Sequence, residues 1–243
     1  MFSKKAARKL ASLPPLVPEM DYAFKKNRQY REEYCEKWFN FYNYVAKKAC
    51  MELEYARYEV KAIITGSAAV KRLDNTVTLL GKNFEVPDYD LVILCKDRNR
   101  FMVFLMDLAR FFKIHGVEIE IAPNLGMYER VIGKDLLVIN LKPKFHPDAP
   151  TFSTIQNPHA DCANDVTCTF DMNICKVAYD IMTGQVTVSP EVIEAIRNRT
   201  AVVDKEFHFK GIVPTPEETK LFAATLLRME KYRARGFVFA SPP

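Results

Sequence analysis

The stretch at residues 63–75, IITGSAAVKRLDN, places a Gly-Ser pair between an apolar run and a helix-like segment. The apolar run predicts a buried strand over 60–66, and the residues from Ser67 onward predict a short helix. Small residues at such a junction let a ligand approach the backbone, and the free N–H groups at a helix start attract anions. Gly66 and Ser67 therefore indicate either a phosphate-binding turn or only a tight turn.

Length and composition restrict the classes of protein to consider. The chain has 243 residues, of which 49% are hydrophobic, and a net charge of +5. This is enough for one large domain or two small ones, and no stretch approaches the roughly 20 apolar residues of a membrane span. Six cysteines without a framework spacing and the absence of a secretory signal predict an intracellular, cytoplasmic protein with reduced thiols. The basic start, residues 1–19, predicts an arm, or alternatively an organelle-targeting peptide.

Hydrophobic periodicity and capping residues predict the remaining elements. Aromatic residues at three- and four-residue spacing favour one long helix, or two joined ones, packed on a core over 20–58. The further expectations are a hairpin or extended excursion at 76–87, a strand at 88–94, a helix at 99–115, strands at 117–123, 128–133 and 134–144, a loop at 145–168, and helices at 170–184, 190–200 and 216–235. This order predicts an α+β fold, with a small mixed sheet, helices on one side of it, and a helical tail.

Three segments follow from this order. Residues 1–19 form the expected basic arm. Residues 20–150 form the expected α/β core with its N-terminal helix, and residues 151–243 the expected helical C-terminal subdomain.

The chemistry is concentrated in Asp88-Tyr89-Asp90, at the start of the strand over 88–94. Residues two apart in a strand point to the same side, so Asp88 and Asp90 should project together while Tyr89 faces away. Two carboxylates that share a face suit a hard divalent cation such as Mg²⁺ or Mn²⁺. The alternative is a polar strand end with two solvated acids. Together with the Gly-Ser turn, the pair favours a nucleotidyl-transfer site, in which metal ions bridge the phosphates of a nucleoside triphosphate.

At this point the sequence resembles the nucleotidyltransferase superfamily typified by DNA polymerase beta. The superfamily pattern is a Gly-Gly or Gly-Ser turn, an Asp-x-Asp or Asp-x-Glu strand, and a third carboxylate on a later strand. Gly66-Ser67 matches the turn, and Asp88-x-Asp90 matches the strand. The resemblance implies that Asp88 and Asp90 are catalytic metal ligands and that Gly66 and Ser67 bind the nucleotide.

The third carboxylate of this pattern has more than one candidate. Glu118 and Glu120 lie on one face of the expected strand at 117–123, and Glu120 is the preferred catalytic residue of the two. In the other alignment the position falls on Asn140, which is neutral and a weaker metal ligand. That alignment would imply reduced or absent catalysis.

A second likeness covers residues 168–186, CTFDMNICKVAYDIMTGQV. It is similar to the Arg-Arg-Asp-Phe-Thr-Ile-Asn-Ala segment of tRNA CCA-adding enzymes and bacterial poly(A) polymerases, which also runs into a Tyr-Asp-x-x-Thr-Gly turn. Asp171, Asn173, Tyr179, Asp180 and Gly184 fit this outline, whereas the two arginines are absent. The resemblance implies that Asp171 contacts the nucleotide.

These observations support two hypotheses of different class. In the first, the chain is a metal-dependent nucleotidyltransferase that transfers a nucleotide to an RNA end or another hydroxyl. Lys71 or Arg72 would then neutralise phosphate charge, and the basic C-terminal helix that ends at Arg235 would be a candidate RNA contact. In the second, the chain is a catalytically inactive binding or scaffold protein in a larger assembly, and the aromatic N-terminal helix is its surface for a protein partner.

Overall fold

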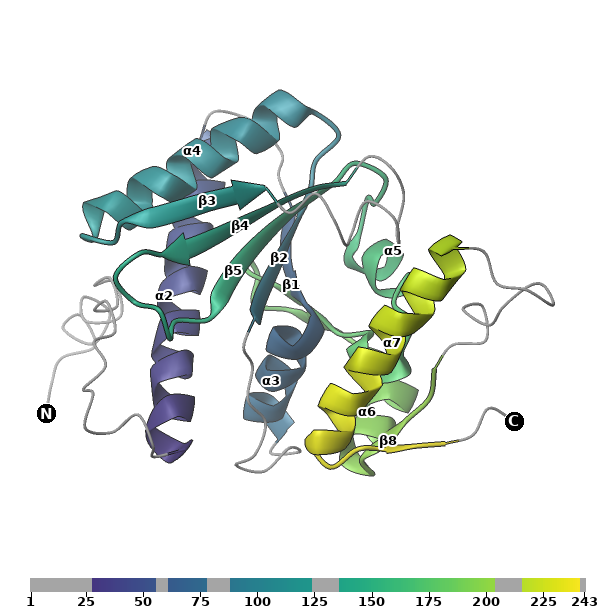
Figure 1. The fold of residues 1–243 in the computed structure, drawn as a ribbon. Helices are drawn as coiled ribbons and strands as arrows, with labels where there is room; N and C mark the ends of the chain where they lie inside the picture. Colours follow the sequence, from purple (N-terminus) through teal and green to yellow (C-terminus); the bar gives the residue numbers. More distant parts are fainter. Residues whose placement is uncertain (1–27, 56–60, 78–87, 124–135, 204–215, 241–243) are drawn as a thin grey trace, which may run out of the picture.

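A mixed sheet of seven strands forms the centre of the protein (Figure 1). The computed structural model describes residues 28–55, 61–77, 88–123, 136–203 and 216–240. The strand order is β3-β4-β5-β2-β1-β6-β7, in which β2 and β5 run parallel and all other neighbours run antiparallel. The strands are β1 (Lys61–Thr65), β2 (Asp88–Leu94), β3 (Ile119–Pro123), β4 (Leu137–Pro143), β5 (Thr151–Asn157), β6 (Ala178–Asp180) and β7 (Val186–Thr187).

Helices cover the sheet, and a small strand pair lies apart from it. The strands β8 (Thr200–Ala201) and β9 (Val238–Phe239) pair in parallel. The helices are α2 (Arg28–Tyr55), α3 (Gly66–Val77), α4 (Arg98–Ile114), α5 (Ala163–Thr167), the 3₁₀ helix η3 (Asn173–Cys175), α6 (Pro190–Arg197) and α7 (Pro216–Ala234). This arrangement confirms the predicted α+β class and mixed sheet. None of the described helices has the length and apolar content that a membrane crossing needs.

The loop predicted at 145–168 is wrong in part, because the segment contains a central strand of the sheet. Residues 151–157 form β5, which pairs with β2 on one side and β4 on the other. The polar residues of this strand are satisfied inside the fold: the Thr154 hydroxyl donates to the Ile139 carbonyl (3.0 Å), and Gln156 Nε2 donates to the Cys95 carbonyl (2.9 Å). The sheet therefore continues past residue 150, where the boundary of the helical subdomain was expected.

The helix expected at 170–184 is also wrong. This segment forms η3 and then β6, which a turn joins to β7. The Asp180 carboxylate accepts from the backbone N–H groups of Met182 and Thr183 (both 2.8 Å), and Gly184 has φ +74°. Hydrogen bonds from backbone N–H groups to an aspartate side chain stabilise a turn in place of a helix. The segment therefore turns here, although the spacing of its apolar residues is that of a helix. The arm at 1–19, the excursion from residue 78 and the strand at 128–133 lie outside the described residues.

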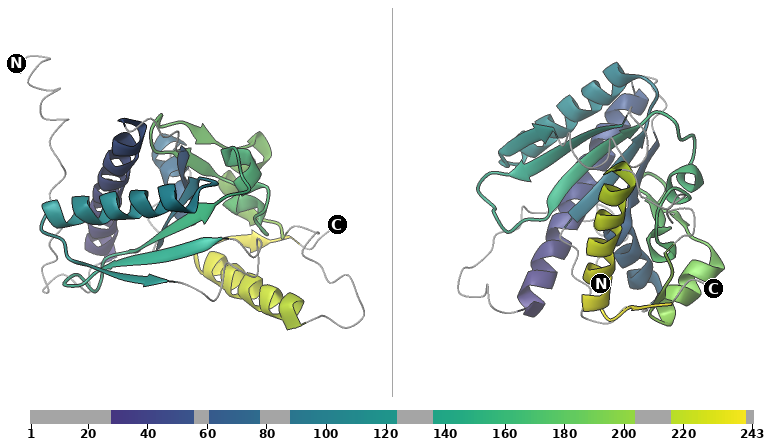
Figure 2. Two further views of the ribbon diagram at one scale, coloured as in Figure 1. Left: turned by 90° about the horizontal axis from the view of Figure 1, so that it is seen from above. Right: turned by 45° about the vertical axis from the view of Figure 1, so that its right-hand side comes forward.

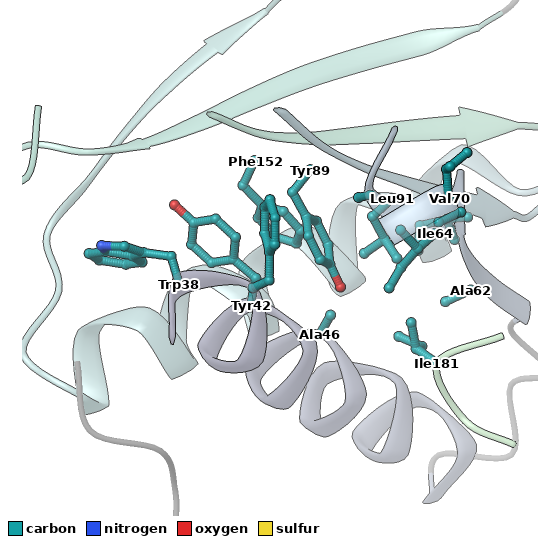
Figure 3. Packing of buried hydrophobic residues seen from close by; sticks show 14 of the residues in the cluster. Trp38, Tyr42, Ala46, Ala62, Ile64, Val70, Tyr89, Leu91, Phe152 and Ile181 are labelled. Atoms are coloured by element: carbon teal, nitrogen blue, oxygen red, sulfur yellow. The ribbon is translucent and has the colours of Figure 1, made fainter. Parts of the chain in front are cut away.

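The aromatic face of α2 forms the core with one face of the sheet. Trp38 and Tyr42 are fully buried on this helix, with Tyr42 beside Tyr89 and Phe152 of the sheet and Trp38 on the far side of Tyr42 (Figure 3). The rings of Tyr42 and Phe152 stack with their centroids 4.9 Å apart. The stripe thus packs on the chain's own sheet, as predicted, so these buried rings are not a surface for a partner, and a protein partner on the rest of this helix stays a prediction.

The two faces of the sheet have different roles. Tyr89 and Leu91 belong to the core cluster that contains residues of α2, α3 and α4. Asp88, Asp90 and Val92 point to the opposite face, where they line a pocket together with residues of α7. Figure 2 shows α2 and α7 on opposite sides of the sheet. Helices therefore cover both faces, whereas the sequence predicted one.

Candidate nucleotide and metal site

The junction between β1 and α3 brings the backbone against a carboxylate. Gly66 begins α3 with φ +63°, a left-handed conformation that favours glycine. A Cβ at this position would lie 3.1 Å from Asp90 Oδ2, so the close approach that Gly66 permits is that of the Asp90 side chain. Ser67 follows as a buried residue in the first turn of the helix. The turn thus positions a carboxylate beside the free N–H groups of a helix start.

Asp88 and Asp90 project together, as their spacing predicts. Both line the same pocket, whereas Tyr89 is 1% exposed and points into the core on the other face. The hydroxyl of Tyr89 is hydrogen-bonded to Asn43 of α2, which holds the start of β2 in place. The register of β1 and β2 pairs Thr65 with Asp90 and so brings the Gly-Ser turn next to the acids.

The electrostatics of the pair favour a cation. Burial and the neighbouring charge of Asp88 raise the pKa of Asp90 to about 6, against the opposing effects of Lys231, a hydrogen bond with Ser153, and Arg228. An ionised Asp90 therefore carries charge that its surroundings stabilise poorly, and a bound cation would relieve this. Two carboxylates on one face match the oxygen ligands that Mg²⁺ and Mn²⁺ prefer, so Asp88 and Asp90 would supply two ligands to one such ion.

Helix α7 supplies cations and a hydroxyl to the same site. Lys231 Nζ lies 3.3 Å from Asp88 Oδ2, and Arg228 Nη2 lies 2.9 Å from Asp171 Oδ2. The Thr225 hydroxyl donates to Asp171 Oδ2 at 2.6 Å. Sequence reasoning assigned Arg228 and Lys231 to a candidate RNA surface and overlooked Thr225. The available signal was their spacing of three residues, which places all three on one face of the helix.

The resulting pocket has a volume of about 290 Å³. Its polar wall contains both aspartates of β2, the Gly-Ser turn and buried Asp171, whose Oδ1 has no hydrogen-bond partner among the described residues. Its lining residues are Thr65, Gly66, Ser67, Asp88, Asp90, Val92, Leu136, Ile155, Asn157, Val166, Thr169, Phe170, Asp171, Cys175, Ala224, Leu227, Arg228, Lys231 and Tyr232. The pocket therefore combines a charged end with an apolar wall, as in ligand sites generally.

The two basic residues expected to neutralise phosphate lie elsewhere. Neither Lys71 nor Arg72 lines the pocket. Arg72 Nη2 donates to Asn40 Oδ1 of α2 (3.1 Å), and its guanidinium lies 5.8 Å from the centre of the Tyr179 ring. Arg235, at the end of the basic helix, is 9% exposed and stacks on the Tyr232 ring at 5.0 Å, so it faces the interior.

The candidates for the third carboxylate are not beside the pair. Glu120 lies on the edge strand β3, opposite Lys142, and β4 and β5 separate it from β2. At the usual strand spacing this is about 14 Å from Asp90. Glu118 forms an ion pair with Lys144 (3.6 Å), and the part of the chain that the structure describes contains no group of three His, Cys, Asp or Glu side chains that could hold a metal ion.

The residue that faces Asp90 on the neighbouring strand is Ser153. The register places Ser153 between Asp90 on β2 and Asn140 on β4. Asn140 is therefore one strand too distant to be the direct neighbour of Asp90. Because β5 was missed in the sequence, Ser153 was missed as well.

Comparison with solved structures shows similarity of fold to CCA-adding enzymes. The Thermotoga maritima CCA-adding enzyme complexed with tRNA matches with a TM-score of 0.51 and 11% identity, over 83% of this chain and 39% of that chain. A CCA-adding enzyme in complex with ATP matches with a TM-score of 0.51 and 10% identity, over 84% of this chain and 39% of that chain. A CCA-adding enzyme in complex with CTP matches with a TM-score of 0.50 and 11% identity, over 83% of this chain and 40% of that chain. The chain thus spans about two-fifths of the length of these enzymes.

These matches confirm the resemblance stated from the motifs, at the level of the fold. No family model matches the chain, and no curated protein sequence does.

The pKa of Asp90 leads to a prediction about stability. The pKa is raised in the folded protein, so ionised Asp90 destabilises the fold, and this cost appears as the pH rises from the ordinary carboxyl value of 3.8 through about 6. Asp90→Asn should therefore raise the free energy of unfolding at pH 7 by about 1–2 kcal/mol, after a discount for partial exposure. The gain should be much smaller at pH 4 and approach zero only below about pH 3, where the wild-type carboxyl is protonated in both states.

Chemical denaturation at pH 7 and pH 4 measures this difference. Asp161→Asn is the matched control, because Asp161 is exposed and forms a surface ion pair with Lys96. Its effect should stay within about 0.5 kcal/mol at both pH values. An equal gain for Asp90→Asn at pH 4 and pH 7 would show that the pKa of Asp90 is not raised.

Proposed function

We propose that this chain is a metal-dependent nucleotidyltransferase, which binds a nucleoside triphosphate in the pocket beneath α7 and transfers a nucleotide to an RNA end or another hydroxyl. One observation carries the proposal: Asp88 and Asp90 line the same pocket, and Asp90 lies against Gly66 at the start of α3. The likeness to CCA-adding enzymes, solved with ATP, CTP and tRNA, supports it at the level of the fold.

Each side of the pocket has a part in this proposal. Asp88 and Asp90 would hold Mg²⁺ or Mn²⁺, which would supply neutralisation of phosphate charge and a lower pKa for the attacking hydroxyl. The backbone N–H groups at Gly66 and Ser67 would donate to phosphate oxygens. Asp171 would accept from the nucleotide through its Oδ1, the buried oxygen without a hydrogen-bond partner among the described residues.

Arg228 and Lys231 take the phosphate-neutralising role that the sequence gave to Lys71 and Arg72. Both side chains line the pocket with the two aspartates and the Gly-Ser turn, whereas Lys71 and Arg72 do not. Transfer of this kind needs positioning and charge neutralisation rather than a covalent intermediate with the protein. The described residues supply both from three elements, namely β2, the start of α3, and α7.

A second candidate function is nucleotide binding without transfer. Lys231 already contacts Asp88, and the described residues offer two carboxylates for a metal ion rather than three. A chain with this site could bind a nucleotide as a signal or as part of a larger assembly. Likeness of fold alone does not grant activity.

Calorimetric titration with ATP and CTP, each with Mg²⁺ or Mn²⁺, tests the proposed site. We expect saturable binding to the wild-type chain that requires the metal. The affinity should fall at least about tenfold in the Asp88→Asn/Asp90→Asn variant, since both charged ligands of the ion are lost. Glu120→Gln serves as the control and should bind like the wild type. No binding of any ribonucleotide to the wild type with either metal would refute the proposed site.

A further inference from the structure

Helix α7 contacts the acids of the site through polar side chains, while Tyr232 belongs to the core cluster. Among residues 222–234 only Thr225 and Tyr232 are buried, whereas Phe222, Leu226 and Leu227 are exposed. Thr225 and Arg228 bind Asp171, and Lys231 binds Asp88. The acids that anchor this helix thus include one proposed metal ligand. Any cation at Asp88 must share that carboxylate with Lys231.

The two anchoring pairs differ in strength. Asp171 is 2% exposed and accepts from both Thr225 and Arg228, so its side of the contact is buried and the hydrogen bond is charge-assisted. The Lys231 and Asp88 side chains are 36% and 43% exposed, at a longer distance of 3.3 Å. Ion pairs exposed to this degree are weak. Lys231 can therefore leave Asp88 while Arg228 keeps the helix in place.

We propose that Lys231 exchanges partners during ligand binding: it neutralises Asp88 in the free protein and turns to the phosphates when a metal ion occupies Asp88. This inference rests on the proposed function and assigns Lys231 a second partner within the same pocket. A lysine suits the role because its ammonium group sits on a flexible four-carbon stem with three rotatable donors. The exchange keeps the charge of the site balanced in both states.

The proposal predicts effects of opposite sign from one substitution. Lys231→Met removes the competitor of the metal, so the affinity for Mn²⁺ alone should rise about fivefold. The same variant lacks a cation for the phosphates, so its affinity for ATP with saturating Mn²⁺ should fall about tenfold. A purely structural role for Lys231 would move both affinities in the same direction or neither.

Two titrations of the full chain measure these affinities. Free Mn²⁺ is followed by its electron paramagnetic resonance signal, and ATP binding is followed by calorimetry at saturating Mn²⁺. Lys231→Arg keeps the charge and should shift each affinity by less than Lys231→Met does. Lys113→Met removes the same charge from the exposed end of α4, on the opposite side of the sheet, and should change neither. Circular dichroism verifies the fold of each variant.

The outcomes separate this inference from the proposed function. Tighter binding of both ligands to Lys231→Met would show that Lys231 only blocks the site, and weaker binding of both would show that it never competes with the metal. Either result, or no change, would overturn the exchange while wild-type binding of ATP with Mn²⁺ left the proposed function standing. Absence of Mn²⁺ binding from both wild type and variant would overturn the exchange and the metal site together.

Discussion

The Asp88→Asn/Asp90→Asn variant is expected to lose metal-dependent nucleotide transfer by at least about a thousandfold while it keeps its fold. Removal of a single electrostatic group from a transfer site commonly costs about a hundred- to a thousandfold in rate, and here both proposed ligands of the metal are removed. The fold should persist because both side chains point into the pocket and not into the aromatic core. The rate is measured as metal-dependent incorporation of labelled ATP or CTP into RNA with a free 3′ hydroxyl.

Glu120→Gln is the informative companion to this variant. Glu120 was the preferred of several candidates for the third carboxylate, whereas the structure places it on the edge strand β3 opposite Lys142. Its replacement should therefore leave the transfer rate within about twofold of the wild type, because no interaction with the pocket is lost. Full transfer by the double aspartate variant would refute the proposed mechanism. Binding without transfer in the wild type would favour the second candidate function.

The sequence allows the polar side of the site to be predicted because it depends on local rules. Strand alternation alone places Asp88 and Asp90 on one side and Tyr89 on the other. The apolar run that breaks at Gly66-Ser67 fixes the end of a strand and the start of a helix, and both elements lie where predicted. The α4 and α7 helices were likewise predicted from periodicity and capping residues.

The rest of the site depends on contacts between distant segments. The strand β5 has the sequence TFSTIQN, whose hydroxyl and amide side chains are typical of an exposed loop. In the structure, the side chains of Thr154 and Gln156 donate hydrogen bonds to carbonyl groups of other segments. Without β5, the neighbour of Asp90 was sought among Glu118, Glu120 and Asn140, and Ser153 was missed. The position of α7 over the pocket could not be predicted either. A row of polar residues on one face of a helix does not indicate which acidic side chains that face contacts.

The buried Phe152 of β5 should contribute strongly to the stability of the fold. Phe152 is fully buried at the centre of the sheet and packs against Tyr42 and Tyr89, with ring centroids 4.9 Å away in each case. Phe152→Ala removes this ring and leaves a cavity among rigid neighbours. We expect it to lower the free energy of unfolding by about 3–5 kcal/mol. Urea denaturation followed by tryptophan fluorescence measures the change, since the single Trp38 lies in the same cluster.

Phe145→Ala is the matched control for this experiment. Phe145 lies six residues before β5 and is 76% exposed, so the same substitution there removes little buried area. Its effect should stay within about 0.5 kcal/mol. If residues 151–157 were the loop that their composition suggests, the two variants would be equally stable. A difference of several kcal/mol between them would instead show that Phe152 packs as part of a central strand, the one that carries Ser153 to the side of Asp90.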